Sequence, residues 1–275
     1  MPGKRAHREP DRLIFTDLDG TLLDHETYSW KAAETALKAA GKAGVPVIFC
    51  TSKNRSEIDV MREIMGNRHP FISENGEAIY VPDGYFSRKP SGSKKKGKYL
   101  VIELGKPYKE LRAVISAMQK KGLKVRGFGD MTVKEVSRLT GLEEKEARLA
   151  RKREYDEPFI IEERAQEPGV NQFIKKQGFQ MTKGGRFWHL ASGSGKGLAV
   201  KILTSMYGAE AGMTPVTAGL GDSPNDFPML RAVHVPYLLQ GPKGNHLSRS
   251  EAFIRVHRKG PEGWNLAVLR FLGVR

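Results

Sequence analysis

The chain has very little cysteine and no long apolar stretch. Its single cysteine, Cys50, cannot form an intramolecular disulfide, which excludes a disulfide-stabilised domain and favours a reducing, cytoplasmic location. It contains no run of about 18 apolar residues, the length that a transmembrane helix needs. Residues 1–12 are basic and polar and lack the apolar segment of a secretory signal. The sequence therefore predicts a globular protein that does not insert into a membrane.

Acidic residues are also scarce relative to basic ones. The chain has 46 Lys and Arg against 31 Asp and Glu, which gives a formal net charge of +15. Such an excess fits a nucleic-acid partner, an anionic small-molecule substrate or a solvated basic surface. Neither a zinc-finger spacing nor an aromatic-rich RNA-binding signature is present, so we expect no nucleic-acid partner. The densest basic run, at 94–98, is interpreted as a mobile, solvated loop.

Both ends of the chain contain alternating apolar strands and helices. We predict strands at 12–16, 45–50, 71–73, 216–220 and 235–239. We predict helices at 30–42, 55–65, 197–207, 226–232 and 261–272. Near-continuous apolar strands separated by helices are typical of a parallel sheet that is covered on both faces. The predicted fold class is therefore α/β, with a doubly wound parallel sheet.

The middle of the chain has a different pattern, which indicates an inserted α+β domain. Strands are expected at 99–104, 123–128 and 159–162, and helices at 107–121 and 143–154. A capping box at 132–135 opens a further short helix. A hairpin of 179–182 and 186–190 is expected to turn at Gly184–Gly185. We therefore predict a core formed by residues 1–81 and 190–275, with the inserted domain at 82–189.

Two carboxylates, Asp17 and Asp19, follow the first predicted strand. Residues two apart on an extended chain point the same way, so both can reach one site where the strand ends. Carboxylate oxygens suit a hard cation, and an aspartate can also act as a nucleophile that forms an aspartyl-phosphate. Gly20 allows a sharp turn and the close approach of a ligand. Taken alone, the same residues fit an ordinary Asp-Gly turn equally well.

Three further motifs lie at strand ends or helix starts. Thr51–Ser52 follow the second strand, where hydroxyls and helix-entry amides bind a phosphoryl oxygen or merely cap a helix. Lys196 stands at a helix N-terminus, where the helix dipole does not favour a cation, so it indicates an anionic partner. Asp222 and Asp226 place two more carboxylates after another strand. Each motif alone is commonplace, but the four together in one parallel α/β chain favour a shared phosphate site.

In this order the four motifs resemble those of the haloacid dehalogenase superfamily of phosphotransferases, which have a Rossmann-like core. The resemblance covers nearly the whole chain and implies that Asp17 is the nucleophile and Asp19 the general acid and base. It implies that Thr51 binds the phosphoryl group and that Lys196 neutralises charge. A carboxylate facing a phosphate dianion is repelled, so a metal ion and a lysine are physically required there. The metal-site residues implied for a Mg2+ cofactor are Asp17, Asp19 (through its carbonyl), Asp222 and Asp226.

The inserted domain resembles the C2-type cap of the sugar-phosphate branch, and several segments are similar to those of mannosyl-3-phosphoglycerate phosphatases. The similar segments are 51–53, 127–132, 139–142, 153–157, 184–189 and 260–264. The resemblance implies an anionic sugar-phosphate substrate, mannosyl-3-phosphoglycerate, which is hydrolysed to mannosylglycerate and phosphate through an aspartyl-phosphate. Glucosyl-3-phosphoglycerate or another sugar phosphate stays open as the substrate, and so does a phosphomutase reaction. A basic nucleic-acid-binding protein with a degenerate core is the alternative from another class.

A substrate that carries both a phosphate and a carboxylate requires cations around its cleft. The guanidinium group of arginine suits such groups because it binds them bidentately. Each candidate cation fits a surface position as well, and Tyr155 and Trp188 fit either a sugar contact or the core. The sequence gives no indication of the oligomeric state. The candidate substrate-binding residues are Ser52, Lys53, Arg55, Arg153 and Arg186.

Overall fold

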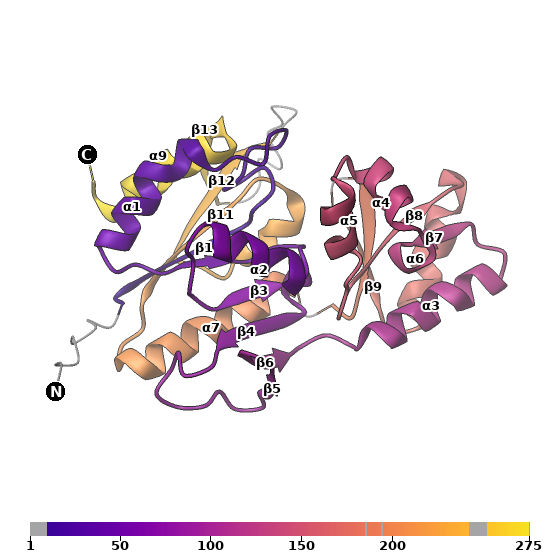
Figure 1. Ribbon diagram of the computed structural model, residues 1–275, viewed down its shortest axis with the longest axis horizontal. Helices are drawn as coiled ribbons and strands as arrows, with labels where there is room; N and C mark the ends of the chain where they lie inside the picture. The colour runs from indigo at the N-terminus through magenta and orange to yellow at the C-terminus, as the bar shows by residue number, and fades with distance from the viewer. Residues whose placement is uncertain (1–9, 185, 194, 242–251, 275) are drawn as a thin grey trace.

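The computed structural model describes residues 10–184, 186–193, 195–241 and 252–274. The chain forms two parts that lie side by side, with segments from both ends of the sequence in the larger part and the middle of the sequence in the smaller part (Figure 1). Among the helices in these ranges, none has the length and apolar character needed to cross a membrane. Residues 1–9 of the basic N-terminal segment, and Gly185 of the predicted hairpin turn, lie outside the described residues.

The larger part, called the core below, is built on a parallel sheet. Its strand order is β13-β12-β11-β1-β2, and each neighbouring pair is parallel. This arrangement confirms the predicted doubly wound α/β fold, although the edge strand β13 was not predicted. The strands are β1 (Arg12–Thr16), β2 (Val47–Phe49), β11 (Val216–Gly221), β12 (Val235–Gln240) and β13 (Ile254–Lys259).

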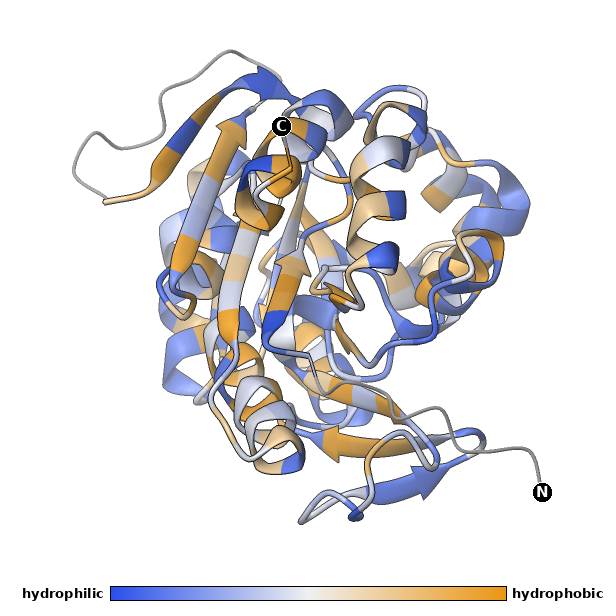
Figure 2. Cartoon of the chain, turned by 90° about the vertical axis from the view of Figure 1, so that its left-hand side faces the viewer, coloured by the Kyte–Doolittle hydropathy of each residue, from blue (hydrophilic) through white to orange (hydrophobic). Residues whose placement is uncertain are grey.

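Helices cover both faces of this sheet. Buried apolar side chains of α1, α2 and α9 pack on one face, and those of α7 and α8 pack on the other. Figure 2 shows the apolar residues concentrated along the strands and on the helix faces turned toward them. The helices are α1 (Glu34–Lys42), preceded by a short 3-10 turn at Lys31–Ala33, α2 (Arg55–Ile64), α7 (Gly195–Ala211), α8 (Phe227–Leu230) and α9 (Gly260–Leu272).

An antiparallel extension continues the core sheet beyond β2. A bridge between Cys50 and Ile72 places β3 (Phe71–Ser73) beside β2, and the order then runs β3-β4-β6-β5. The additional strands are β4 (Ala78–Pro82), β5 (Lys94–Lys96) and β6 (Tyr99–Glu103).

The prediction of a mobile loop at 94–98 is therefore wrong. Lys94 and Lys95 pair with Glu103 and Asp83 at 2.6 and 2.8 Å, and charged lysines are common on edge strands, where they discourage further pairing. Backbone pairing with β6 fixes this segment as a strand even though its sequence has no apolar alternation.

The extension also bears on where the inserted domain begins. Val81 and Leu100 belong to the same apolar cluster as Ile48 of β2 and Leu203 of α7. The backbone amides of Leu104 and Gly105 then donate to the carbonyl of Glu77. The Glu77 carboxylate accepts hydrogen bonds from Ser192 and Gly193, so both crossings between the two parts meet at one residue. We propose that the inserted domain runs from about residue 106 to 191, in place of 82–189.

This inserted domain, called the cap below, is an antiparallel sheet with helices on both faces. Its strand order is β7-β8-β10-β9, with α3 and α6 packed on one face and α4 and α5 on the other. Helix α6 was not predicted, and the helix predicted at 143–154 ends at Ala150, which leaves Arg153 in the following loop. The strands are β7 (Val125–Gly127), β8 (Glu157–Ile161), β9 (Gln180–Gly184) and β10 (Phe187–Ala191), and the helices are α3 (Tyr108–Lys120), α4 (Val133–Thr140), α5 (Glu144–Ala150) and α6 (Glu167–Lys176).

Candidate active site

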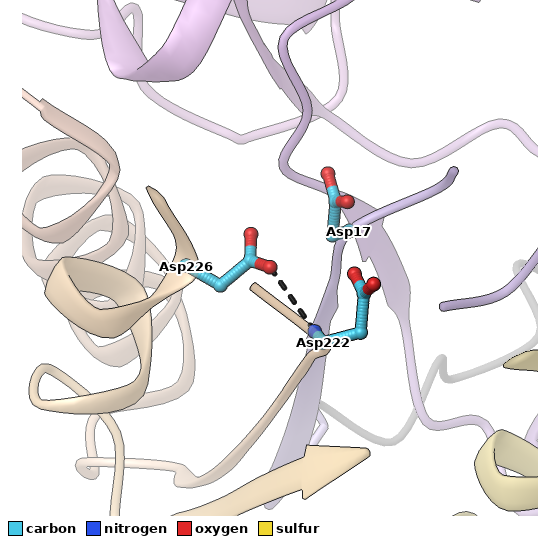
Figure 3. A group of neighbouring side chains, drawn as sticks. All are labelled: Asp17, Asp222 and Asp226. Carbon is cyan, nitrogen blue, oxygen red and sulfur yellow. Dashed lines mark hydrogen bonds between the residues drawn. The ribbon is translucent and has the colours of Figure 1, made fainter. Parts of the chain in front are cut away.

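Two neighbouring strands bring the first and last acidic motifs together. Asp17 directly follows β1 and Asp222 directly follows β11, and these strands pair in parallel. Gly20 has φ +76°, and a Cβ added there would lie 2.9 Å from a carboxylate oxygen of Asp222, so a side chain would crowd the site. Oxygens of Asp17, Asp222 and Asp226 lie within 4.8 Å of one another, and Figure 3 shows Asp17 and Asp222 side by side. The sheet topology thus assembles an acidic cluster at its carboxyl edge.

Lys196 supplies the cation of this cluster from the first turn of α7. Its Nζ lies 2.9 Å from Asp17 Oδ1 and 2.6 Å from Asp226 Oδ1, and the side chain is 1% exposed. Burial favours the neutral amine, but the charges of Asp17 and Asp226 outweigh it and raise the pKa of Lys196. The lysine therefore stays protonated between the two carboxylates.

Asp226 and Asp222 have different surroundings. Asp226 uses Oδ1 for Lys196 and Oδ2 for the backbone amides of Asp222 and Ser223, each at 3.1 Å (Figure 3). Asp222 Oδ1 accepts from the Thr21 hydroxyl at 3.1 Å. Asp226 is thus occupied in holding the loop and the lysine, whereas Asp222 keeps an oxygen for a cation.

The cluster has the chemistry of a metal site. Burial is the main cause that raises the pKa of Asp17 and of Asp222. Neighbouring acidic groups raise the pKa of both further, and the single charge of Lys196 does not offset these effects. A bound divalent cation removes this repulsion, and an all-oxygen donor set suits a hard ion. Asp17 and Asp222 are the residues that fit a metal ion, with Asp226 supporting them.

Asp19 lies beside this cluster and is held differently. Its Oδ2 pairs with Lys53 Nζ at 2.9 Å, whereas its buried Oδ1 has no hydrogen-bond partner in the described part of the chain. Burial opposes the charge of Lys53, but Asp19 and Glu57 raise the pKa of this lysine. Asp19 is therefore oriented through one oxygen, and its other oxygen is open to a further partner.

The Thr51–Ser52 motif is held by a strained neighbouring turn, η2 (Glu74–Gly76). The amide of Asn75 donates to the carbonyl of Thr51 at 2.9 Å, and that of Glu74 donates to the carbonyl of Lys53 at 3.0 Å. Glu74 and Asn75 both have positive φ, which is uncommon for residues other than glycine. The Thr51 loop is thus fixed from outside by backbone hydrogen bonds.

A close backbone contact joins this turn to the lysine. A Cβ at Gly76 would lie 2.3 Å from the carbonyl carbon of Gly195, and Gly76 has φ +100°. Only glycine permits this approach. It brings η2 and the start of α7 together, and with them the Thr51 loop and Lys196.

The structure separates the five predicted substrate-binding residues. Lys53 lies at the site, beside Asp19. Arg55 instead pairs with Glu154 at 2.8 Å, across the junction between core and cap.

Arg153 reaches from the cap to the core. It is buried and donates at 2.9 Å to the backbone carbonyl of Ser52, and it also pairs with Asp156 at 3.0 Å. Its contact with the Thr51 loop is thus through the backbone of Ser52.

Arg186 lies on the cap and is exposed. Its Nη1 donates to the carbonyls of Leu139 and Thr140 at 3.1 and 3.3 Å, which caps the C-terminus of α4. The two aromatic candidates are occupied structurally: Tyr155 is buried and donates to Glu103, and Trp188 packs under Lys183.

Two residues at the site, Thr21 and Tyr28, were not predicted to have a role. Thr21 follows Gly20 after the first acidic pair, and its hydroxyl donates to Asp222, which lies 201 positions further along the chain. Tyr28 lies in the loop after that motif and packs beside Lys53, with Nζ 5.5 Å from the ring centroid. Nothing in the local pattern around Tyr28 indicates this position.

The fold and the site define a phosphate-ester hydrolase, and comparison with known proteins agrees. Residues 14–240 match the haloacid dehalogenase-like hydrolase family, so the chain belongs to that family and is a phosphoric monoester hydrolase. Hydrolases of this family generally use a divalent metal ion, which the buried aspartates fit.

Individual relatives within this family are similar to the chain over most of its length. The chain is 44% identical over 268 residues to the glucosyl-3-phosphoglycerate/mannosyl-3-phosphoglycerate phosphatase of Methanococcoides burtonii, covering 95% of this chain and 97% of the relative. It is 35% identical over 229 residues to the mannosyl-3-phosphoglycerate phosphatase of Pyrococcus furiosus, covering 83% and 90%. Among solved structures, the sucrose-phosphatase of Synechocystis has a TM-score of 0.63 at 13% identity, covering 96% of this chain and 98% of that one. This last likeness shows the fold.

Proposed function

We propose that the protein is a Mg2+-dependent phosphatase that hydrolyses mannosyl-3-phosphoglycerate to mannosylglycerate and phosphate. The observation that carries the phosphatase chemistry is the buried cluster of Asp17, Lys196 and Asp222 beside the half-free carboxylate of Asp19. The names of the relatives from M. burtonii and P. furiosus support the choice of substrate. The first of these names includes glucosyl-3-phosphoglycerate, which is the second candidate substrate.

The geometry supports a two-step reaction. Asp17 attacks phosphorus, and the P–O bond to the sugar acid breaks as Asp19 gives a proton to the leaving alkoxide. Asp19 then takes a proton from water as that water attacks the aspartyl-phosphate, which releases phosphate and restores Asp17. Lys196 and the Thr51 loop balance charge on the phosphoryl oxygens. Asp17, Asp222 and the Asp19 carbonyl would hold Mg2+, which when bound would supply further positive charge at the phosphate.

The position of the cap supports selection of the substrate above this site. Asn54, at the start of α2, donates to the carbonyls of Leu149 and Ala150 at the end of α5, at 2.8 and 3.1 Å. Strand β9 of the cap also lies against η5 (Pro224–Asp226) of the acidic cluster. The cap therefore contacts the core both at the start of α2 and at the acidic cluster, so we propose that Lys53 of the core and Arg186 of the cap bind the carboxylate of the substrate.

The deciding experiment is phosphate release from a panel of sugar phosphates, measured with Mg2+, with EDTA and with excess Ca2+. We expect the highest kcat/KM for mannosyl-3-phosphoglycerate, loss of activity with EDTA, recovery with Mg2+ and inhibition by Ca2+. Full activity without metal would refute the metal assignment, and a distinctly better substrate would refute the proposed one. Transfer of the phosphoryl group to a sugar rather than to water would indicate a phosphomutase.

We propose a cytoplasmic location and no nucleic-acid partner. The ion pairs of Lys94 and Lys95 with carboxylates support the second point, because these charges are already balanced. A salt-dependent shift of DNA or RNA at near-physiological ionic strength would contradict it.

A further inference from the structure

Among the described residues, three other than glycine have positive φ, and all three lie near the active site. Glu74 and Asn75 form η2 beside the Thr51 loop, and Tyr28, with φ 55°, lies in the loop that follows the acidic pair. A bulky side chain in this region is a true conformational outlier, and such strain concentrates at functional sites. The Tyr28 side chain is 40% exposed, so burial of its ring does not explain the strain.

The loop that carries Tyr28 is fixed by its own hydrogen bonds. Asp24 Oδ1 accepts from the amides of Glu26 and Thr27 at 3.1 and 2.8 Å. The Asp24 amide donates to the carbonyl of Ser29 at 2.9 Å, and the Tyr28 amide donates to the carbonyl of Asp24 at 3.0 Å. These hydrogen bonds fix the backbone of the loop, which sets the position of Tyr28.

That position is next to the expected acid-base residue. Lys53 Nζ lies 5.5 Å from the centroid of the Tyr28 ring and 2.9 Å from Asp19 Oδ2. The leaving oxygen of the substrate must lie at Asp19, because Asp19 protonates it. Lys53 and Tyr28 therefore lie within reach of the group attached to that oxygen.

Charges of the cap reach the same phenol. Burial and Asp19 raise the pKa of Tyr28, Lys53 and Arg186 oppose the increase, and Glu146 adds to it. Arg186 and Glu146 belong to the cap, whereas Asp19 and Lys53 belong to the core. Tyr28 thus lies where charged residues of the core and of the cap come together.

We propose that Tyr28 is the platform of the core for the glycosyl ring of the substrate, with its ring against the sugar and its hydroxyl toward the cap. An aromatic side chain with an apolar face and a polar tip suits a sugar, which has the same two characters. The identity of the sugar rests on the proposed function, whereas the position of Tyr28 does not. A core residue would then share with the cap the task of selecting the sugar.

The test compares a glycosylated substrate with the same ester lacking its sugar. Tyr28→Asn removes the ring and inserts a residue that tolerates positive φ, so the melting temperature should hold or rise. We expect kcat/KM for mannosyl-3-phosphoglycerate to fall about 10- to 30-fold, and that for 3-phosphoglycerate to fall less than about threefold. Tyr28→Phe is the matched control, since it keeps the ring and should lose only a few-fold on either ester.

Equal losses on both esters would overturn the proposal, because Tyr28 would then act by orienting Lys53 and Asp19. No loss on the glycosylated ester would overturn it as well.

The proposed function is tested separately, by the panel of sugar phosphates with the wild-type enzyme. If another sugar phosphate is the best substrate, the proposed substrate is wrong, and the same comparison with that ester and methyl phosphate still decides the role of Tyr28. If the wild-type enzyme hydrolyses no sugar phosphate, both proposals are wrong.

Discussion

Two clusters in the described part of the chain each place one lysine or arginine among three carboxylates. In the first, the Lys196 cluster, the carboxylates are Asp17, Asp222 and Asp226. In the second, the Arg153 cluster, they are Glu57, Glu74 and Asp156, at 3.6, 3.3 and 3.0 Å from the guanidinium.

The Arg153 cluster has almost every acceptor occupied. Glu74 also accepts from the amides of Glu154 and Tyr155 at 3.0 and 2.7 Å. Asp156 also accepts from His189 and Asn75 at 2.8 and 3.2 Å. Burial opposes ionisation of Asp156, but the charges of His189 and Arg153 outweigh it and lower its pKa. The planar fork of Arg153 can hold several partners at once, so this cluster is a joint between cap and core.

The Lys196 cluster differs because acceptors remain open. Lysine is a compact charge, and it neutralises Asp17 and Asp226 without reaching Asp222. The direction of the pKa shifts does not separate the clusters, because burial raises the pKa of Asp17 and Asp222 and also that of Glu74 beside Arg153. The clusters differ instead in whether the carboxylate oxygens are paired: almost all are paired around Arg153, whereas Asp222 keeps an oxygen open beside Lys196.

The largest expected effect comes from the nucleophile of the reactive cluster. Asp17→Asn keeps the shape of the side chain but removes the attacking oxygen, so kcat should fall by about 10⁴-fold or more. The measurement is phosphate release from a variant whose circular dichroism and melting curve match the wild-type protein. Asp19→Asn should also be severely impaired, with phosphorylated enzyme accumulating where the second step needs the base. Substantial turnover by folded Asp17→Asn protein would refute the assignment of the nucleophile.

Removing the cation from each cluster tests the comparison directly. Arg153→Met leaves buried carboxylates without a partner, so the free energy of unfolding should fall by about 3–5 kcal/mol. Lys196→Met should lower kcat by about 100- to 1,000-fold, on the scale of a lost electrostatic contact in a transition state.

The two variants should also respond differently to metal. The proposed Mg2+ site, at Asp17 and Asp222, is next to the position of Lys196, so adding Mg2+ should recover part of the stability that Lys196→Met loses. It should not recover the stability of Arg153→Met. The measurement is the melting temperature of both variants with EDTA and with Mg2+. Equal recovery in both variants would show that the clusters do not differ in the way described.

The sequence was sufficient to predict the acidic part of the Lys196 cluster, because Asp17 and Asp222 follow parallel strands. The carboxyl ends of neighbouring strands meet at one edge, so Asp17 and Asp222 could be placed together from their positions after β1 and β11 alone. The Arg153 cluster could not be predicted in this way. Arg153 and Ser52 are 101 positions apart, and their contact depends on how the cap sits on the core.

The elements that sequence analysis missed have the same physical explanation. Strand β5 is a lysine run without apolar alternation. In β13, Ile254 and Val256 alternate with polar residues, but Arg258 and Lys259 end the pattern after four residues, so the strand signal is weak. Their strand conformation follows from backbone pairing with β6 and β12. Tertiary pairing thus outweighs local pattern at the edges of the sheet, whereas its apolar centre was predicted correctly.

A smaller effect is expected from removing an unbalanced charge. Burial, together with the charges of Asp226 and Asp17, raises the pKa of Asp222 to about 8, compared with 3.8 ordinarily. The folded carboxyl therefore binds a proton that the unfolded one has released, and the stability of metal-free wild-type protein falls as pH rises between these values.

Asp222→Asn lacks this group, so its melting temperature without metal should exceed that of the wild-type protein by several degrees at pH 8. The difference should shrink toward pH 4, and Mg2+ should reverse it by stabilising only the wild-type protein. A difference that does not change with pH would show that Asp222 is not destabilised by its surroundings.

The smallest effect is expected outside both clusters, on the edge strand β5. Lys95 pairs with Asp83 at 2.8 Å, but its side chain is 65% exposed, and water screens such a pair. Lys95→Ala should therefore leave the melting temperature and kcat/KM unchanged within error. Lys96→Ala is the matched comparison on the same strand. Lys96 pairs with Glu103 of β6 and donates to Tyr155 at 2.6 Å, and the contact with Tyr155 joins the strand to the cap. A measurable loss in Lys96→Ala alone would show that burial and partners, and not the density of charge in the run, decide which lysines matter.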